Sequence, residues 1–397
     1  MPEESRQGWM SLTVVLFGFT FFSATMMAGG QLGKALGYGA GLAKAVLVGN
    51  LLLAVYAAAL SYVAFRSGLS TVLMSRHCFG ARGSALADLV LGLTQVGWYA
   101  WGTDTVATVL IQTFHWPSEL YVPMVLLAGL GFSITATIGY KGLEVLSATT
   151  VPLMAGLIFW SGYIALAHPS TPGGGGGEMT LSQAVTIVVG TFVSGATQST
   201  NWTRYSRTAT SSVVVTFLAF FLGNGLMVGY GALAGSVYQN SDVVAVLILQ
   251  GLFAPALFML LANIWTTQDN TIYNFSLAGC HFFRTERRRL VTFLGAVLGT
   301  LLALFGFSGY LVPFLLALGT SIPPVGGVIL ADFFYCRRGA YPSLASVHEA
   351  WMWQGLTAYA GGLAAAWWLP GIAPVNGVLT AFLLQALLMR RSEGRLV

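Results

Sequence analysis

Several strongly apolar stretches of the sequence contain polar and aromatic residues at spacings that could bind a small molecule. Residues 191–197 hold Phe192 and the pair Ser194–Gly195 in the middle of one such stretch. A break in a membrane helix frees backbone N–H and C=O groups, which is tolerable only where they face protein, water or a ligand. We therefore predict a helix break at Ser194–Gly195 that forms half of a small-molecule site at the membrane midplane.

A second group lies on an apolar stretch near residue 95. Gln95 and Trp98 are three residues apart, so they share one face of a helix. A buried amide needs a hydrogen-bond partner, and a neighbouring helix could supply it with Trp98 merely packed. The other interpretation is a flat heteroaromatic ligand that stacks on Trp98 and bonds to Gln95 along its edge, with Phe192 closing the opposite face.

A polar stripe crosses the stretch around residue 263. Thr266 and Thr267 follow Asn263 by three and four residues, so their hydroxyl groups can lie near the Asn263 carbonyl. Two hydroxyls and several carbonyls would make an oxygen cage with little charge, which suits a monovalent cation better than a divalent one. The alternative is that both threonines hydrogen-bond back onto their own helix.

The first apolar stretch, residues 18–30, also has polar and small residues in its middle. Tight helix packing through small residues would explain them. A second helix break would explain them as well, and paired breaks at matching positions are the best sequence signal of a transporter site. The carbonyls of Gly18 and Phe21 could then face the same cation.

Other chemistry finds little support. No G-x-x-x-x-G-K-[ST] nucleotide loop, metal-ligand spacing or Ser/His/Asp set at one depth is present, so we expect no enzyme. Asp269, Asp104 and Asp88 lie in or near apolar stretches, and an acid at membrane depth could carry a proton. Proton coupling therefore stays open as an alternative to sodium.

The composition is that of an all-α polytopic membrane protein. Of 397 residues, 56% are hydrophobic and 8% are charged, against roughly 25% charged in a soluble domain. A span needs about 20 residues, and this predicts twelve transmembrane helices. They cover residues 9–33, 40–65, 84–113, 120–139, 144–167, 181–201, 209–235, 242–276, 290–307, 309–332, 351–368 and 373–390.

The charges predict the orientation. With the N-terminus in the cytoplasm, all 18 basic residues except Lys34 and Lys44 fall on the inside, as the positive-inside rule requires. Both termini are then cytoplasmic. The basic surplus is a signal of topology, so we expect no nucleic-acid partner, and no obligate protein partner is evident.

A glycine-rich loop at 168–178 separates two blocks of five spans. Because each block has an odd number of spans, the second is inverted relative to the first. We predict a first five-helix repeat at 1–170, an inverted repeat at 171–335 and two additional C-terminal transmembrane helices at 336–397.

Residues 18–30, 92–101 and 320–332 resemble the bacterial cytosine permeases of the nucleobase–cation symporter family. The resemblance covers essentially the whole chain. It implies a LeuT-type five-plus-five inverted repeat with discontinuous helices one and six, and sodium-coupled import of cytosine across the bacterial inner membrane by alternating access.

The resemblance also implies roles for particular residues. Trp98 and Phe192 would sandwich the base. Gln95 and Ser194, with backbone near Thr191 and Gly195, would hydrogen-bond its edge. The implied sodium ligands are Gly18, Phe21, Asn263, Thr266 and Thr267.

Rival functions remain. The family includes proton-coupled members and members for other heterocycles such as hydantoin, allantoin or purines. A channel would need a continuous polar pore, which the midplane aromatic residues oppose. A substrate sensor would bind without accumulating its ligand.

Overall fold

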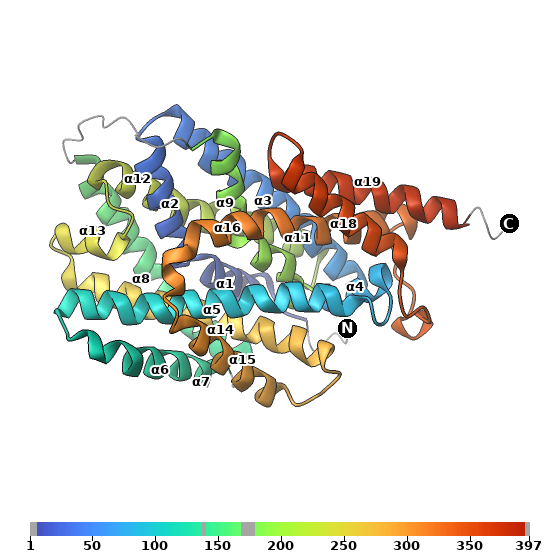
Figure 1. Cartoon of the computed structure of the whole chain (residues 1–397), viewed down its shortest axis with the longest axis horizontal. Helices are drawn as coiled ribbons and strands as arrows, with labels where there is room; N and C mark the ends of the chain where they lie inside the picture. The colour runs from blue at the N-terminus through green and yellow to red at the C-terminus, as the bar shows by residue number, and fades with distance from the viewer. Residues whose placement is uncertain (1–5, 137–139, 168–178, 394–397) are drawn as a thin grey trace.

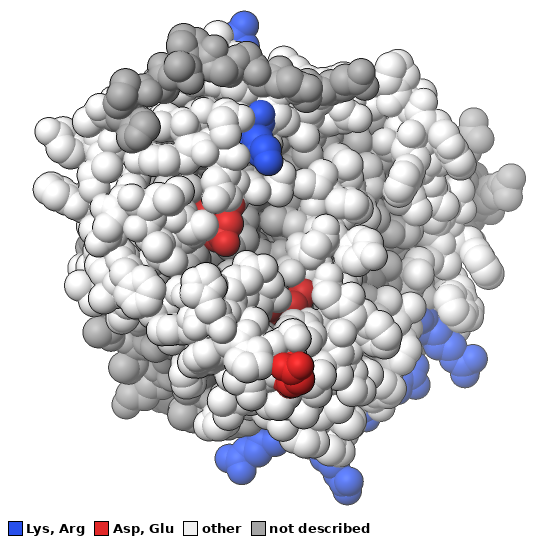
Figure 2. Space-filling view, turned by 60° about the vertical axis from the view of Figure 1, so that its left-hand side comes forward, with Lys and Arg blue, Asp and Glu red and all other residues white. Residues whose placement is uncertain are grey.

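The computed structural model describes residues 6–136, 140–167 and 179–393. Within these ranges the regular structure is helical, and the one strand-like feature is an isolated bridge between Gln7 and Ser206. Many long helices, including α5 and α19, run lengthwise through the molecule (Figure 1). On the face shown in Figure 2 most of the surface is uncharged, as expected of a protein embedded in lipid.

Each predicted span corresponds to one helix or to a group of consecutive helices in the described chain. The spans in order are α1 (Trp9–Thr20) with α2 (Ser23–Leu36); α3 (Ala40–Ser67); α5 (Ser84–Phe114); α6 (Tyr121–Gly131) with α7 (Ser133–Ala136); α8 (Tyr140–Ala167); α9 (Leu181–Gln198) with α10 (Thr200–Thr203); α11 (Ala209–Leu218) with α12 (Gly225–Tyr238); α14 (Phe253–Phe282); α15 (Arg288–Ala303); α16 (Leu311–Ser321) with α17 (Pro323–Ala331); α18 (Trp353–Trp368); and α19 (Ala373–Glu393).

By length and apolar composition alone, five stretches of the described helices could each cross a membrane, and the bent pair α1–α2 makes a sixth. The remaining spans are shorter, interrupted or rich in buried polar residues. The division predicted near Ser308 is present, because α15 ends at Ala303 and a 3-10 turn, η4 (Phe307–Tyr310), precedes α16. Gly306, at φ 70°, permits the chain to reverse there.

Two short helices were not predicted. The segment predicted as one span at 242–276 is two helices, α13 (Val243–Leu249) and α14, separated at Gly251 with φ 79°. That prediction was wrong because the apolar run hid a left-handed glycine turn. The other short helix, α4 (Thr71–Phe79), lies between spans two and three.

The first span is broken at Phe21–Phe22, where α1 and α2 meet at 48°. Phe21 (ψ 86°) and Phe22 (φ −130°, ψ 131°) leave the helical region. The Phe22 carbonyl accepts the backbone N–H of Thr25 at 3.1 Å and its hydroxyl at 2.8 Å, which starts the new helix. The carbonyls of the last turn of α1, beginning at Gly18, have no further helical residues to bond to.

The sixth span is interrupted four residues later than predicted. Helix α9 runs unbroken through Ser194–Gly195 and ends at Gln198, and α10 begins after Ser199. The prediction of a break at Ser194–Gly195 was therefore wrong. A β-carbon on Gly195 would lie 2.7 Å from the ring of Phe192 and 2.8 Å from that of Phe19. The residue is small because rings approach it, and a helix interior tolerates one glycine at modest cost.

Helix α4 explains how the interruption at Ser199 is stabilised. The Thr71 hydroxyl donates to the Thr197 carbonyl near the end of α9, and the Thr71 backbone N–H donates to the Thr200 hydroxyl at 2.9 Å. All of these groups are buried. The polar groups freed at the helix end are thus satisfied by protein rather than lipid.

Small residues bring α2 and α12 into close contact. A β-carbon on Gly231 would lie 1.8 Å from the Met26 carbonyl oxygen, and one on Gly29 would lie 2.1 Å from the Val228 carbonyl oxygen. Glycine at both positions lets the two backbones touch, as is common for helices packed in lipid. The second half of span one, α2, is therefore fixed against α12 in span seven.

His77, at the end of α4, gives a test of stability against pH. Its ring is fully buried and stacks on Tyr341, with centroids 4.5 Å apart. Burial, followed by the charges of Arg337 and Arg76, lowers the pKa of His77 from 6.5 to about 4. As pH falls, His77 takes up a proton near its ordinary pKa in the unfolded chain, but only near the lowered pKa in the folded chain. Stability is therefore lost as pH falls through this window.

We expect this loss to reach about 2 kcal/mol at about pH 5. His77→Phe keeps a stacked ring without a titrating group, so it should lose less stability on acidification. Thermal unfolding of the detergent-solubilised protein at neutral and acidic pH measures the difference. An equal loss in both proteins would contradict the prediction.

Candidate functional site

All six residues predicted to bind a substrate line one cavity in the middle of the molecule. The cavity has a volume of about 10 Å³, and its walls come from α1, the α1–α2 break, α5, α9 and α14. This volume is close to the minimum for one water molecule, so the walls of the site touch one another. The lining residues are Phe19, Phe22, Gln95, Trp98, Thr191, Phe192, Ser194, Gly195, Thr267 and Thr271.

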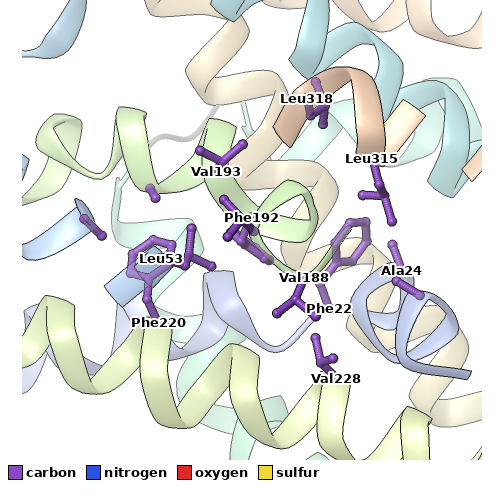
Figure 3. Packing of buried hydrophobic residues seen from close by; sticks show 14 of the residues in the cluster. Phe22, Ala24, Leu53, Val188, Phe192, Val193, Phe220, Val228, Leu315 and Leu318 are labelled. Atoms are coloured by element: carbon purple, nitrogen blue, oxygen red, sulfur yellow. The ribbon is translucent and has the colours of Figure 1, made fainter. Parts of the chain in front are cut away.

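Aromatic rings make most of the contacts between the walls of this cavity. Phe22 packs edge-on against Trp98, with centroids 5.5 Å apart, and against Phe192, with centroids 6.4 Å apart. Phe192 also meets Phe19 in a T-shaped pair at 4.8 Å. Figure 3 shows Phe22 and Phe192 packed in the same region, from the α1–α2 break and from α9. The ring of Phe22 thus contacts both of the residues predicted to sandwich a base.

Polar groups of the site bond to each other. The Trp98 indole N–H donates to the Ser194 hydroxyl at 3.1 Å, which joins α5 to α9. Gln95 is buried, and its side-chain amide donates a long bond of 3.3 Å to Thr94. A ligand between α5 and α9 could therefore replace these two hydrogen bonds with bonds of its own to Ser194 and Gln95.

Thr191 contributes to the site differently. Its hydroxyl donates to the Val188 carbonyl at 2.6 Å and accepts from the Asn224 amide at 3.0 Å. Asn224 in turn donates to Asn50 at 2.8 Å. The Thr191 side chain is thus engaged with Asn224, at the end of the π-helical segment Ala219–Asn224, and through Asn224 it is linked to Asn50 of α3.

Gly195 offers a direct test of how tightly the rings are packed. Gly195→Ala should displace the rings of Phe192 and Phe19, because the new methyl group would lie under 3.0 Å from both rings. We expect ligand binding at this cavity to weaken by about tenfold or more while folding survives, since a ring shift costs about 1–3 kcal/mol. Ligand binding and thermal unfolding measure the two effects. Gly131→Ala, where nothing lies within 4 Å, is the matched control.

Three of the predicted cation ligands, Asn263, Thr266 and Thr267, lie on α14, and the Asn263 side chain bonds to the residue that follows the break in span one. The Thr266 and Thr267 hydroxyls donate to the Asn263 carbonyl at 2.8 Å and 3.3 Å. The Asn263 side-chain oxygen accepts the Ser23 backbone N–H at 2.6 Å and the Ser23 hydroxyl at 2.7 Å. Oxygen atoms of α14 are therefore tied to the start of α2, next to Phe21.

Gly18 is buried in the last turn of α1, three residues before Phe21. Both threonines bond back onto their own helix, which was the alternative interpretation of the sequence. That bonding does not exclude a cation, because each hydroxyl oxygen keeps lone pairs while its hydrogen is donated. The donor set contains only neutral oxygens, which suits a monovalent ion.

The three acids have different surroundings. Asp88 pairs with His281 at 2.5 Å, and Asp104 accepts the backbone N–H of Ser308 at 2.7 Å. Asp269 is fully buried on α14 rather than near the solvent. Asp88 and Asp104 thus join helices together.

Sequence reasoning missed Phe19, Phe22, Ser23 and Thr271. Phe22 and Ser23 stand at the break itself, and the clustering of polar residues in the first span was the only signal for them. Phe19 lies on α1 three residues before Phe22, and Thr271 lies one turn after Thr267 on α14. Thr271 could have been found by extending the proposed face of α14 by one helical turn, whereas Phe19 does not share the face proposed for Gly18 and Phe21.

The chain has clear relatives of known activity. A sequence profile described as permease for cytosine/purines, uracil, thiamine, allantoin matches residues 1–388. The cytosine permease of Escherichia coli strain K12 is 37% identical over 391 residues, which cover 96% of this chain and 90% of that protein. The hydantoin permease of Microbacterium maritypicum is 23% identical over 365 residues, with coverages of 82% and 74%.

Solved structures agree on the fold. Mhp1, a nucleobase-cation-symport-1 family transporter seen closed with bromovinylhydantoin bound, matches with a TM-score of 0.84 and 21% identity over 98% of this chain and 93% of that one. A Na⁺-coupled sialic acid symporter in a substrate-bound outward-open state matches with a TM-score of 0.71 and 12% identity, covering 98% and 90%.

These likenesses fix the class of the protein. The fold is the LeuT-type arrangement of a polytopic transporter, with its first and sixth spans discontinuous. The profile match leaves only the last few residues uncovered, and the relatives are permeases rather than enzymes. This multi-pass membrane protein therefore belongs to the family of permeases for cytosine, purines, uracil, thiamine and allantoin.

Proposed function

We propose that this protein is a sodium-coupled symporter that imports cytosine across the bacterial inner membrane by alternating access. The observation that carries the proposal is the meeting of Gln95, Trp98, Phe192 and Ser194 in one cavity next to the break in span one. The 37% identity to a cytosine permease over nearly the whole chain supports cytosine as the substrate.

In this mechanism the base enters between Trp98 and Phe192. Phe22 swings aside, and the base replaces its edge-on contacts with two stacked faces. The Ser194 hydroxyl and the Gln95 amide then bond to the edge of the base, with backbone groups at Thr191 and Gly195. The Ser194 hydroxyl exchanges its bond with the Trp98 indole for a bond to the base, so few polar groups are left without a hydrogen bond.

Sodium would bind where α14 meets the break. Its ligands are the carbonyls of Gly18 and Phe21 with oxygens of Asn263, Thr266 and Thr267. An ion at this place holds α1 and α14 together and so favours a conformation open to the outside. The shift is as large as the difference in sodium affinity between the two conformations.

The arrangement of the chain follows from the same proposal. Residues 1–170 and 171–335 form the two inverted repeats, and 336–397 add two spans. Both termini lie in the cytoplasm, since this orientation places nearly all basic residues inside.

A second candidate function is proton-coupled transport of another heterocycle, such as hydantoin, allantoin or a purine. The full burial of Asp269 on α14 favours it, because a buried carboxyl group can carry a proton. The two candidates differ in which gradient drives uptake.

Uptake of labelled cytosine into proteoliposomes tests the proposal. An inward sodium gradient should drive accumulation above the external concentration, and unlabelled cytosine should compete better than hydantoin or allantoin. Equal accumulation with a proton gradient and no sodium would assign coupling to a proton. Binding without accumulation would indicate a sensor, and flux that never saturates would indicate a channel.

A further inference from the structure

A larger cavity lies just outside the central site. Its volume is about 410 Å³, and its walls come from α2, the outer half of α5, the residues before α13 and the start of span ten. We call it the vestibule. Trp101, in its wall, packs edge-on against Phe22 with centroids 5.5 Å apart. Phe22 in turn contacts Trp98, so a single aromatic layer separates the vestibule from the central site.

One wall of the vestibule is fixed by a buried carboxylate. Asp104 accepts the Ser308 backbone N–H at 2.7 Å, the Thr108 hydroxyl at 3.0 Å and the Tyr121 hydroxyl at 2.8 Å. Thr108 and Ser308 both line the vestibule. Three bonds from three elements hold this wall in place beside the turn at Gly306.

The opposite wall is also held by a hydrogen bond. The Gln31 amide on α2 donates to the Ser241 hydroxyl at 3.0 Å, and both residues line the cavity. The vestibule is therefore a built cavity with two positioned walls.

Two polar groups beside this cavity have no hydrogen-bond partner among the described residues. They are the indole N–H of Trp101 and the hydroxyl of Thr105, which lie one turn apart on α5 and are buried. Leaving a buried polar group unpaired costs about 1–3 kcal/mol. A ligand in the vestibule that reaches either group would recover part of that cost.

An acceptor faces the same space. Asp242 uses its Oδ1 atom to cap α13, accepting the Val244 and Ala245 backbone N–H groups at 2.9 Å and 3.3 Å. Its Oδ2 atom has no hydrogen bond within the described chain, and the residue lines the vestibule. The walls of the cavity thus hold a buried indole ring, two unpaired donors and one carboxylate oxygen.

We propose that the vestibule is a second, weaker binding site for a small planar heterocycle with both donors and acceptors. It rests on the proposed function, because the ligand is the transported base itself. The base binds against Trp101 and bonds to the Thr105 hydroxyl and the Asp242 carboxylate. It waits there until Phe22 moves and opens the central site.

Equilibrium binding of labelled cytosine to the purified protein in saturating sodium tests this site. Wild-type protein should show two components, a tight one and one at least about tenfold weaker. Trp98→Ala should remove the tight component and keep the weak one. Thr105→Val and Asp242→Asn should each weaken the weak component by about threefold to tenfold and leave the tight one unchanged.

Controls keep the result interpretable. Trp101→Phe keeps an aromatic ring beside Phe22 but loses the indole N–H group and part of the ring surface, so it should weaken the weak component at least as much as Thr105→Val. Thr300→Val changes a buried threonine on α15 that bonds to its own helix, and it should alter neither component. Thermal unfolding shows whether each variant is folded.

The outcomes separate this inference from the proposed function. One component with a stoichiometry of one in wild-type protein overturns the second site and leaves the symporter intact. A weak component that survives Thr105→Val, Trp101→Phe and Asp242→Asn together also overturns it. Absence of any cytosine binding to folded wild-type protein overturns both.

Discussion

Replacing Trp98 by alanine is expected to weaken cytosine binding by about 10- to 100-fold. Stacking of a base on one aromatic face contributes about 1–3 kcal/mol by alanine substitution, and each 1.4 kcal/mol is a factor of ten. The substitution also removes the indole that bonds to Ser194 and packs on Phe22 and Phe314. Both the stacking face and the shape of the site are lost.

Trp98→Phe separates these two contributions. It keeps a ring for stacking and loses the indole N–H that holds Ser194 at 3.1 Å. We expect an intermediate loss of about three- to tenfold, because one replaceable hydrogen bond contributes about 1 kcal/mol. Binding of labelled cytosine in saturating sodium measures both variants.

Trp116→Ala is the matched control for this series. Trp116 follows α5 and is 40% exposed, far along the chain from the central cavity. It should bind cytosine like wild-type protein. If Trp98→Ala stays within threefold of wild type while remaining folded, Trp98 does not stack on the base.

The fold was largely predictable from the sequence because lipid imposes strong constraints. A span must be long and apolar, and basic residues must favour one side, so the pattern of apolar runs gave twelve spans. Even the narrow division near Ser308 was correct, since one helix could not hold the combined run. Where an apolar run concealed a turn, as at Gly251, the same reasoning failed.

The position of the sixth-span break was not predictable from local composition. Ser194 and Gly195 look like a helix interruption, yet they are small because Trp98, Phe192 and Phe19 approach them. The actual interruption at Ser199 depends on Thr71, whose hydroxyl donates to the Thr197 carbonyl. Nothing in the sequence around residue 199 signals this contact. A helix end stabilised by a distant residue requires tertiary information.

The site residues show the same division. Gln95 and Trp98 follow from helical spacing, and residue types alone suggested Phe192 on the opposite face of a ligand. The hydrogen-bonding role of Ser194 beside them came only from the family resemblance. Phe22 gave no signal of its own, because an aromatic residue in an apolar span is ordinary. Its contact with Trp98 and Phe192 depends on the angle between α1 and α2.

The cation ligands give the second large effect. Thr266→Val should raise the sodium concentration for half-maximal uptake by about tenfold, because it removes one neutral oxygen worth about 1.4 kcal/mol. Cytosine affinity at saturating sodium should stay unchanged, since Thr266 does not line the central cavity. Thr292→Val, a buried threonine on α15 that bonds to its own helix, is the matched control.

Thr267→Val should behave differently, because Thr267 lines the central cavity and also donates to the Asn263 carbonyl. We expect a higher sodium concentration for half-maximal uptake. We also expect a lower cytosine affinity, which saturating sodium does not restore. Sodium titrations of uptake at several cytosine concentrations distinguish the two variants. If Thr266→Val and Thr267→Val both keep the wild-type sodium dependence, the cation does not bind between α1 and α14. If Thr267→Val alters sodium alone, the two ligands do not share this threonine, and the coupling between them must pass through Ser23 and the break in span one.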